Sequence, residues 1–178
     1  MANDSTRWIA PDPALAASYQ SLIDESIALG EDFYPRLFAF LGLDTTNAAG
    51  AVPMLLALED IPGDSRLVPT STRWLVDGQG CLLGECRLRH RLNERLLHHG
   101  GHIGYFVRPS ARRQGHATRM LALMLCEASR IGLFRVLLTC DKSNTGSASV
   151  IRANGGVLED EPVSRFSHQV IQRYWIAL

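Results

Sequence analysis

The sequence predicts an α/β (α+β) protein, and three stretches of the chain carry this prediction. The segment from Ile103 to Cys140 has the pattern of a strand, an amphipathic helix and a second strand, which is typical of a right-handed parallel crossover. The segment 72–91 has the pattern of a β-hairpin. Helical spacing of apolar residues dominates the segment 15–41. Together these stretches predict strands and helices combined in one α/β domain.

The first seventy residues predict mainly helices. Residues 7–9 have the composition of a short strand, and prolines follow it. Apolar residues from Leu15 to Ile27 keep helical spacing up to Gly30, which suits a helix C-cap, and a second helix is expected over 32–41. Residues 45–50 have the composition of a loop, and the apolar segment 54–58 does not indicate one type of structure.

The hairpin has two distinct faces. Leu82, Cys86 and Leu88 alternate with Glu85 and a series of arginines, so the sequence predicts one apolar and one polar face. Glu85 has two interpretations, a site carboxylate or the partner of an arginine on the same face. His90 falls on the apolar face and is expected to be structural. Residues 92–99 are polar and are expected to form a connection.

The crossover has a short apolar strand at 101–107 and a helix with one apolar face. The apolar positions of this helix are Ala117, Met120, Leu121, Met124, Ala128 and Ile131. The nearly continuous apolar run 134–140 predicts a central strand that is covered on both faces. Turn-forming residues follow at 141–147, and a short helix is expected up to 154–156.

A cationic turn lies between the first strand and the helix of the crossover. It carries Arg108, Arg112 and Arg113, followed by Gly115. The free backbone N–H groups of a helix's first turn attract anions, and a glycine lets a phosphate approach the backbone closely. The turn therefore predicts an anion site, although solvated arginines on an ordinary turn would give the same pattern.

The composition of the chain limits the kinds of ligand it is expected to bind and the compartment in which it is expected to work. The chain has 18 basic and 18 acidic residues and a formal net charge of zero, which argues against nucleic acid or an anionic membrane as a partner. Arginines nevertheless cluster at 87–95 and 108–113, which suits a small phosphorylated ligand. The four cysteines lack C-x-x-C spacing and are interpreted as buried thiols in a reducing compartment. Residues 1–7 show no signal pattern, and a cytoplasmic location is expected.

Two motifs resemble the signatures of the GNAT N-acetyltransferases. The order Arg112-x-x-Gly115-x-Ala117 resembles the pyrophosphate loop of that family. Asn144-x-x-Ser147, followed by 151–156, resembles its second signature. The two motifs stand in the family's order, separated by one helix and one strand, and the recognisable match covers roughly residues 70–160. Three further short segments, residues 87–90, 100–105 and 173–176, also resemble an uncharacterised bacterial subgroup of predicted acetyltransferases.

The resemblance implies a mixed, mostly antiparallel twisted sheet, flanked by helices, in which two parallel central strands splay apart. It implies one domain over 1–178, with the acceptor side in 1–69, an acetyl-CoA-binding core in 70–160 and a C-terminal strand in 161–178. Acetyl-CoA (coenzyme A) would be the co-substrate, and no metal is expected. The residues expected to bind it are Phe106, Val107, Arg112, Arg113, Gln114, Gly115, His116, Ala117, Thr118 and Asn144.

Acetyl transfer requires a neutral amine, donors for the developing oxyanion and a proton for the leaving thiolate. His102 and Glu85 are the candidate bases. Many family members supply the proton from a tyrosine at the position of Ile151, which cannot donate one. The group that replaces it could be Ser147, Ser149, Tyr105 or water. The candidate catalytic residues are therefore His102, Glu85 and Ser147.

The resemblance implies an N-acetyltransferase that works by direct attack in a ternary complex. Two alternatives remain open: acyl transfer through Cys140, and a catalytically silent acyl-CoA-binding or regulatory module. The acceptor would be a small-molecule or peptide amine, with neither nucleic acid nor membrane as a partner. The sequence does not distinguish a monomer from a homodimer.

Overall fold

The structure is a computed structural model that describes residues 6–62 and 67–178, and its described strands form two sheets. The first sheet has the order β1-β2-β3-β4, with strands β1 (Arg7–Ile9), β2 (Thr70–Val76), β3 (Leu82–Arg89) and β4 (Ile103–Val107). The second has the order β5-β7-β6, with strands β5 (Arg135–Asp141), β6 (Val157–Asp160) and β7 (Ile171–Ala177). Every pairing within each sheet is antiparallel.

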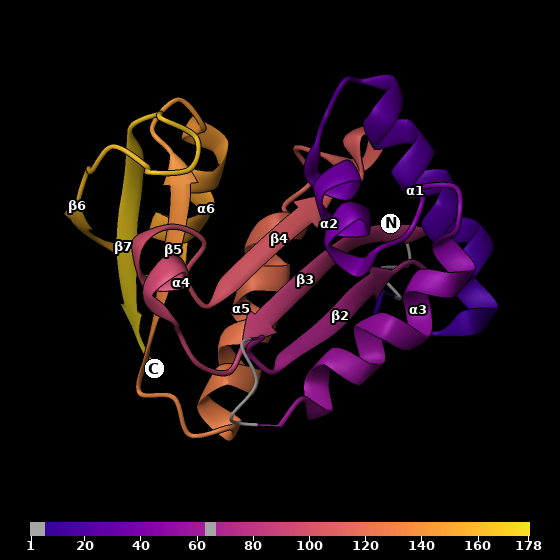
Figure 1. The fold of residues 1–178 in the computed structure, drawn as a ribbon, viewed down its shortest axis with the longest axis horizontal. Coiled ribbons are helices and arrows are strands. Elements are labelled where there is room, and N and C mark those ends of the chain that lie inside the picture. The colour runs from indigo at the N-terminus through magenta and orange to yellow at the C-terminus, as the bar shows by residue number, and fades with distance from the viewer. Residues whose placement is uncertain (1–5, 63–66) are drawn as a thin grey trace.

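Helices cover the sheets from both sides. The α-helices are α1 (Ala16–Ala28), α2 (Phe33–Leu41), α3 (Ala48–Ala57), α4 (Glu94–His98), α5 (His116–Arg130) and α6 (Thr145–Ala153). Three short 3-10 helices are Pro13–Leu15, Leu58–Asp60 and Pro109–Ala111. Figure 1 shows α1, α2 and α3 on one side of the first sheet and α5 on the other. Within the described ranges, no helix has both the length and the apolar character needed to cross a membrane.

The two sheets meet at β4 and β5, the strands of the predicted crossover. Figure 1 shows that β4 and β5 run in the same general direction and diverge toward their C-terminal ends. A mixed α/β fold with mostly antiparallel pairing and two splayed parallel strands is confirmed. The apolar run predicted as a central strand forms β5, which is largely buried and whose ladder partner is the antiparallel strand β7.

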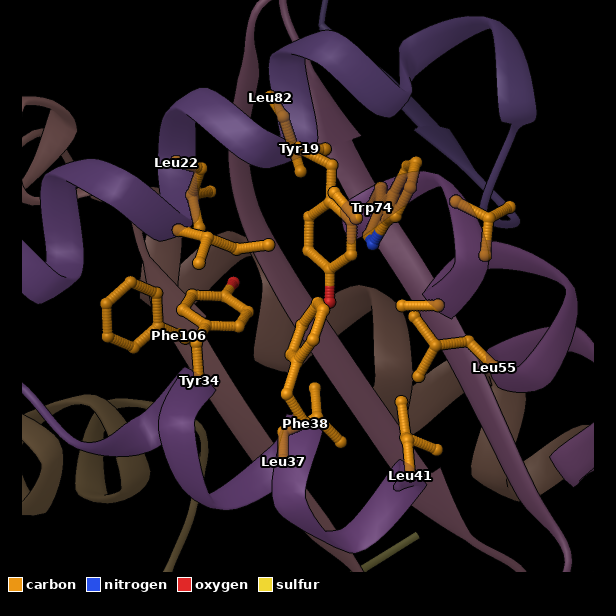
Figure 2. Packing of buried hydrophobic residues seen from close by; sticks show 14 of the residues in the cluster. Tyr19, Leu22, Tyr34, Leu37, Phe38, Leu41, Leu55, Trp74, Leu82 and Phe106 are labelled. Carbon is orange, nitrogen blue, oxygen red and sulfur yellow. The ribbon is translucent and has the colours of Figure 1, made fainter. Parts of the chain in front are cut away.

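The face of the first sheet that was predicted to be polar is buried. Trp74 on β2 and Phe106 on β4 lie on this face with Glu85, and the N-terminal helices cover it with Tyr19 and Tyr34. Figure 2 shows these aromatic rings packed together between the helices and the sheet. Tyr19 and Trp74 have ring centroids 4.7 Å apart. The predicted alternation of residues is correct, but the polar face is not a solvent face because a second layer of helices covers it.

The other face of the first sheet packs against α5. Four of the apolar positions predicted for α5, Met120, Leu121, Met124 and Ala128, are fully buried. Ala117 in the first turn is half-buried, and Ile131, which follows the helix, is 46% exposed. This second core continues through the inner side of β5 and α6. The predicted apolar face was therefore correct along the middle of α5 and less complete at its two ends.

Several local predictions were wrong or incomplete. The apolar segment at 54–58 and part of the presumed loop at 45–50 form one helix, α3, whose start is capped by the Asn47 side chain. The presumed connection at 92–99 contains α4, capped by Asn93. All four cysteines are free, but Cys126 is exposed and Cys81 only partly buried. Residues 1–5, most of the segment used to judge targeting, lie outside the described residues.

Helix α1 is fixed to the end of β4 by a cluster of polar contacts. The buried Arg108 guanidinium donates to the Glu25 carboxylate at 2.9 Å and to the backbone carbonyls of Ser18 (3.1 Å) and Leu82 (2.8 Å). Glu25 also accepts hydrogen bonds from the backbone N–H and the hydroxyl of Ser110. Burial opposes ionisation of Glu25, but the hydrogen bonds from Ser110 and Arg108 outweigh it and lower its pKa.

We expect Glu25→Gln to destabilise the protein by about 2 kcal/mol at neutral pH, because it weakens hydrogen bonds to a charged arginine. A carboxylate with a lowered folded pKa contributes stability above its ordinary pKa of 4.5, and this contribution is lost as pH falls through the folded pKa. The difference between wild type and variant in urea unfolding should therefore shrink below about pH 4.

Asp24→Asn is the matched control, because it also removes one negative charge from α1. The Asp24 carboxylate accepts a hydrogen bond from Gln20 of the same helix and does not contact Arg108. An unfolding free energy of Glu25→Gln equal to that of Asp24→Asn at neutral pH would contradict the proposed anchoring.

Candidate functional site

The turn between β4 and α5 presents backbone N–H groups without a side-chain cap. Gly115, the N-cap of α5, has φ +81°, and no side chain of the described chain caps the helix there. A Cβ placed on Gly115 would meet no atom within 4 Å, so the space in front of this backbone is open. The N–H groups from His116 to Thr118 begin the helix and have no partner one turn earlier. This geometry suits an anion.

The arginines of this turn do not all face the open space. Arg108 is buried beneath α1, as described above. Arg112 donates from both terminal nitrogens to the Glu31 carboxylate, at 2.6 and 2.8 Å, and its guanidinium lies 5.3 Å from the Phe106 ring centroid. Arg113 is exposed and has φ +64°. The anion site therefore depends on backbone groups more than the arginine-rich sequence suggested.

The residues Phe106 and Val107 lie where β4 leaves β5. Phe106 is buried against Phe33 of α2, with ring centroids 5.0 Å apart and stacked. Val107 is partly buried on the α5 side of the sheet. The edge of β4 that faces β5 is not paired with any described strand, because β4 is the edge strand of its sheet. The backbone groups of Phe106 face β3, where Phe106 pairs with Glu85, so a ligand entering between the strands could use the backbone of Val107.

His102 forms the contact at which β4 and β5 still touch. Its backbone N–H donates to the Leu137 carbonyl at 2.7 Å, and its Nδ1 accepts from the Leu137 N–H at 2.9 Å. Burial, and then the charge of Arg89, lower the pKa of His102 to about 4. A neutral ring whose Nδ1 accepts carries its hydrogen on Nε2. This bonding uses the lone pair of Nδ1, so the geometry does not favour the predicted role of His102 as a base.

A group of polar side chains spans the gap between the diverging strands. The Tyr105 hydroxyl on β4 lies 2.8 Å from the Ser147 hydroxyl on α6. Cys140 of β5 is buried nearby, and its pKa is raised by burial, with a hydrogen bond to Ser147 acting in the opposite direction. A thiol with a raised pKa stays protonated at neutral pH, which argues against Cys140 as an acyl carrier.

The second motif begins α6. The Asn144 side chain accepts a hydrogen bond from the Ser147 N–H at 3.0 Å, so it caps the helix in this structure. Ile151 is buried in the core between α5, α6 and the strands. The structure therefore brings Ser147 and Tyr105 together, while the side chain at 151 takes no part in the polar group.

Glu85 is completely buried and lies away from the β4–β5 gap. It accepts from the Trp74 indole N–H at 3.1 Å, and its other oxygen lies 3.2 Å from Nε of Arg87. The hydroxyls of Tyr19 and Tyr34 are buried near it, and burial, followed by the Glu85 charge, raises the pKa of both. The interpretation of Glu85 as an arginine partner on the same face agrees with this geometry.

A cavity of about 530 Å³ lies beside the narrow end of the gap. We call it the arginine cavity, because α2, β3 and α4 contribute Arg36, Arg87, Arg89 and Arg95 to its lining. His99 also lines it, and its Nδ1 lies 2.6 Å from the Ser164 hydroxyl. Sequence reasoning missed this cavity, although the cluster of arginines at 87–95 was a visible signal. Within the described residues, no group of three potential metal-binding side chains occurs.

Comparison with known proteins identifies a family and a fold. A family profile described as the acetyltransferase (GNAT) domain matches residues 56–157, more than half of the chain. No curated protein sequence matches at a significant level. Among solved structures, a ribosomal L7/L12 alpha-N-protein acetyltransferase in complex with coenzyme A has 16% identity and a TM-score of 0.74, over 97% of this chain and 94% of that one.

Two further solved structures have the same fold. A Salmonella typhimurium acetyl transferase, which modifies the N-terminal serine of ribosomal protein L7/L12, has 16% identity and a TM-score of 0.69, over 97% of this chain and 95% of that one. Spermidine N-acetyltransferase from Vibrio cholerae, in complex with coenzyme A and spermine, has 15% identity and a TM-score of 0.65, over 97% and 95%. At 15–16% sequence identity, the similarity to these structures establishes that the fold is shared.

We expect the two variants His102→Phe and His102→Asn to differ in stability. Phenylalanine leaves the Leu137 N–H buried without an acceptor, which costs about 1–3 kcal/mol, whereas the asparagine side-chain oxygen can replace Nδ1. Urea unfolding at pH 7.5 measures this difference. Equal stabilities of the two variants would contradict the structural role of His102.

The pH dependence of stability offers a second measurement on the same residue. The folded pKa of about 4 lies below the ordinary value of 6.5, so the unfolded chain binds a proton first as the pH falls through this window. The wild type should therefore lose more stability than His102→Asn between these two pH values. Parallel losses in the two proteins would contradict the lowered pKa.

Proposed function

The chain belongs to the GNAT acetyltransferase family, and on this premise we propose that it transfers the acetyl group of acetyl-CoA to an amine by direct attack in a ternary complex. One observation carries the proposal: the uncapped start of α5, with open space in front of Gly115, lies at the end of the strand that diverges from β5. An anion site and an adjacent free strand edge are the two features that a long phosphorylated thioester would need.

The residues present suit coenzyme A. We propose that N–H groups from Gln114 to Thr118 hold the pyrophosphate and that the backbone of β4 at Val107, next to Phe106, binds the pantetheine arm. Arg113 is exposed beside the turn and adds positive charge. Arg112 stays paired with Glu31 and orders the turn, and Asn144 holds α6 in place next to the gap.

Acetyl-CoA supplies an activated acetyl group whose carbonyl carbon accepts a nucleophile. The neutral acceptor amine forms a bond from nitrogen to this carbon, the carbon–sulfur bond breaks, the amine loses a proton and the sulfur gains one. We propose that water in the arginine cavity receives the amine's proton, because no carboxylate of the described residues lines this cavity. Glu85 then acts as a positioning residue that holds Arg87.

The proton for sulfur is assigned to the pair formed by Tyr105 and Ser147. Burial raises the pKa of the Tyr105 hydroxyl, and the weaker opposing effect of the Ser147 hydrogen bond leaves the phenol protonated at neutral pH. The two hydroxyls lie 2.8 Å apart and span the gap where the thiol would leave. This pair would take the role that the family's tyrosine cannot fill here, since Ile151 occupies its position.

We expect Gly115→Ala to weaken coenzyme A binding about tenfold, because the added methyl group occupies the space in front of the backbone N–H groups. Isothermal titration calorimetry measures the dissociation constant. Gly132→Ala is the matched control, because Gly132 follows the other end of α5, has φ +87°, and a Cβ added to it would likewise meet no atom within 4 Å. Equal affinities of the two variants would overturn the placement of the pyrophosphate.

We expect Tyr105→Phe to lower kcat about 100-fold with little change in coenzyme A affinity, because it removes a proton donor but no binding group. Release of free thiol from acetyl-CoA measures kcat. Tyr174→Phe is the control, since the Tyr174 hydroxyl contacts Arg152 and Gln172 and makes no hydrogen bond with Tyr105 or Ser147. An unchanged kcat in Tyr105→Phe would contradict Tyr105 as the proton donor.

A further inference from the structure

The arginine cavity carries more positive charge than the described residues neutralise. Arg36 is paired with Asp32 at 2.9 Å, and Arg87 is paired with Glu85. Neither of these carboxylates belongs to the lining of the cavity. Arg89 and Arg95 have no carboxylate partner within residues 6–62 and 67–178. The lining therefore has four arginines, of which two are ion-paired, and one further carboxylate, that of Asp141, acts electrostatically on His99.

The unpaired arginines are held in fixed positions by neutral groups. The Arg89 guanidinium donates to the carbonyls of Gly100 (3.1 Å) and Gly101 (3.0 Å). The Arg95 guanidinium lies 4.9 Å from the centroid of the Phe166 ring. Burial, and then the charges of Arg87 and Arg95, lower the pKa of Arg89 to about 10. Like charges held together in a partly buried site lose repulsion when an anion binds between them.

His99 adds a hydrogen-bond donor to the same wall. The Ser164 hydroxyl oxygen accepts from the backbone N–H groups of Phe166 (3.1 Å) and Ser167 (3.2 Å). Its own hydrogen is then directed to Nδ1 of His99, 2.6 Å away. The pKa of His99 is lowered by burial, so the neutral ring carries its hydrogen on Nε2. The described lining thus offers donors and cations rather than a carboxylate that could hold a cationic ligand.

The cavity adjoins the place where acetyl transfer would occur. Its lining residue Gly100 donates its N–H to the Thr139 hydroxyl on β5 at 2.9 Å, which places the cavity at the narrow end of the gap. Its lining residue Phe33 stacks on Phe106 of β4. Between these points, Gly104 pairs with Arg87 in the register of β3 and β4 and has no side chain to separate the cavity from the strand.

Resting on the proposed function, we propose that the acceptor is an amine that also carries a carboxylate and that the arginine cavity binds this carboxylate. Guanidinium groups match the planar geometry of a carboxylate and can bind it through two hydrogen bonds. The cavity has the size of an ordinary small-molecule site, and its aromatic walls suit the aliphatic part of such a molecule. A polyamine, which lacks a carboxylate and carries several positive charges, would be repelled.

Direct binding tests the cavity without any reaction. Glutarate, a dicarboxylate without an amine, is titrated into the protein at low ionic strength and followed by calorimetry. We expect saturable binding that Arg95→Gln weakens about tenfold, because one charge-assisted contact is lost. Arg130→Gln is the matched control: it removes the same charge from the exposed last turn of α5 and should leave binding unchanged. Failure of glutarate to bind the wild type, or equal affinities in both variants, would overturn the proposal.

Acceptor specificity tests the same proposal during turnover. Thiol release from acetyl-CoA is compared for 4-aminobutyrate, the amide of 4-aminobutyrate, and spermidine. It is also compared for two tripeptides with an amidated C-terminus, one with Glu and one with Gln at the second position. We expect each carboxylate-bearing member to exceed its neutral partner about tenfold in kcat/KM, with Arg95→Gln reducing this ratio and Arg130→Gln preserving it. The amine pair and the peptide pair distinguish a free small acid from an acidic peptide N-terminus.

The two proposals can fail separately. Turnover that favours spermidine or the neutral amides would overturn the carboxylate proposal and leave acetyl transfer intact. Coenzyme A that fails to bind, together with Arg95-dependent binding of glutarate, would contradict acetyl transfer while supporting the carboxylate site. Circular dichroism melting of both arginine variants establishes that they are folded before either comparison is made.

Discussion

The contact between His102 and Leu137 is the constraint on which the arrangement of the site depends. It joins the two sheets at one point through a backbone hydrogen bond and a hydrogen bond to the imidazole. Past this point, β4 and β5 diverge, and the backbone groups on the facing edge of β4 lose the partners that a continuous ladder would give them. The site therefore exists because the sheet is held together at one end and left open at the other.

The same contact explains why a residue with catalytic chemistry serves structure here. A histidine next to a proposed reaction centre invites a role as a base. The buried ring, its lowered pKa and the hydrogen bond accepted by Nδ1 give it a different task. In contrast, Tyr105 lies three residues later, within β4, and its hydroxyl contacts that of Ser147 on α6 across the opening. The point of divergence thus separates a structural polar contact from one that is available for chemistry.

The sequence predicted the features that depend on local patterns. The period of α5, the alternation in β3 and the glycine before α5 follow from neighbouring residues, and the structure agrees with them. It could not predict which carboxylates meet which arginines. Glu25 and Glu31 lie about 80 residues from Arg108 and Arg112, and only the folded chain shows that they neutralise most of the cationic turn. The buried state of Glu85 likewise depends on helices that are distant in sequence.

The formal net charge of zero conceals a separation of charge within the fold. The β4–α5 turn looks strongly cationic in sequence, yet two of its arginines are paired with α1 and the adjoining loop, which leaves mainly backbone dipoles for an anion. At the arginine cavity the opposite holds, since Arg89 and Arg95 have no carboxylate partner among the described residues. Backbone dipoles suit a pyrophosphate, which can accept many hydrogen bonds at once, and guanidinium groups suit a compact carboxylate. The two kinds of positive site therefore favour two different anionic ligands, one on each side of β4.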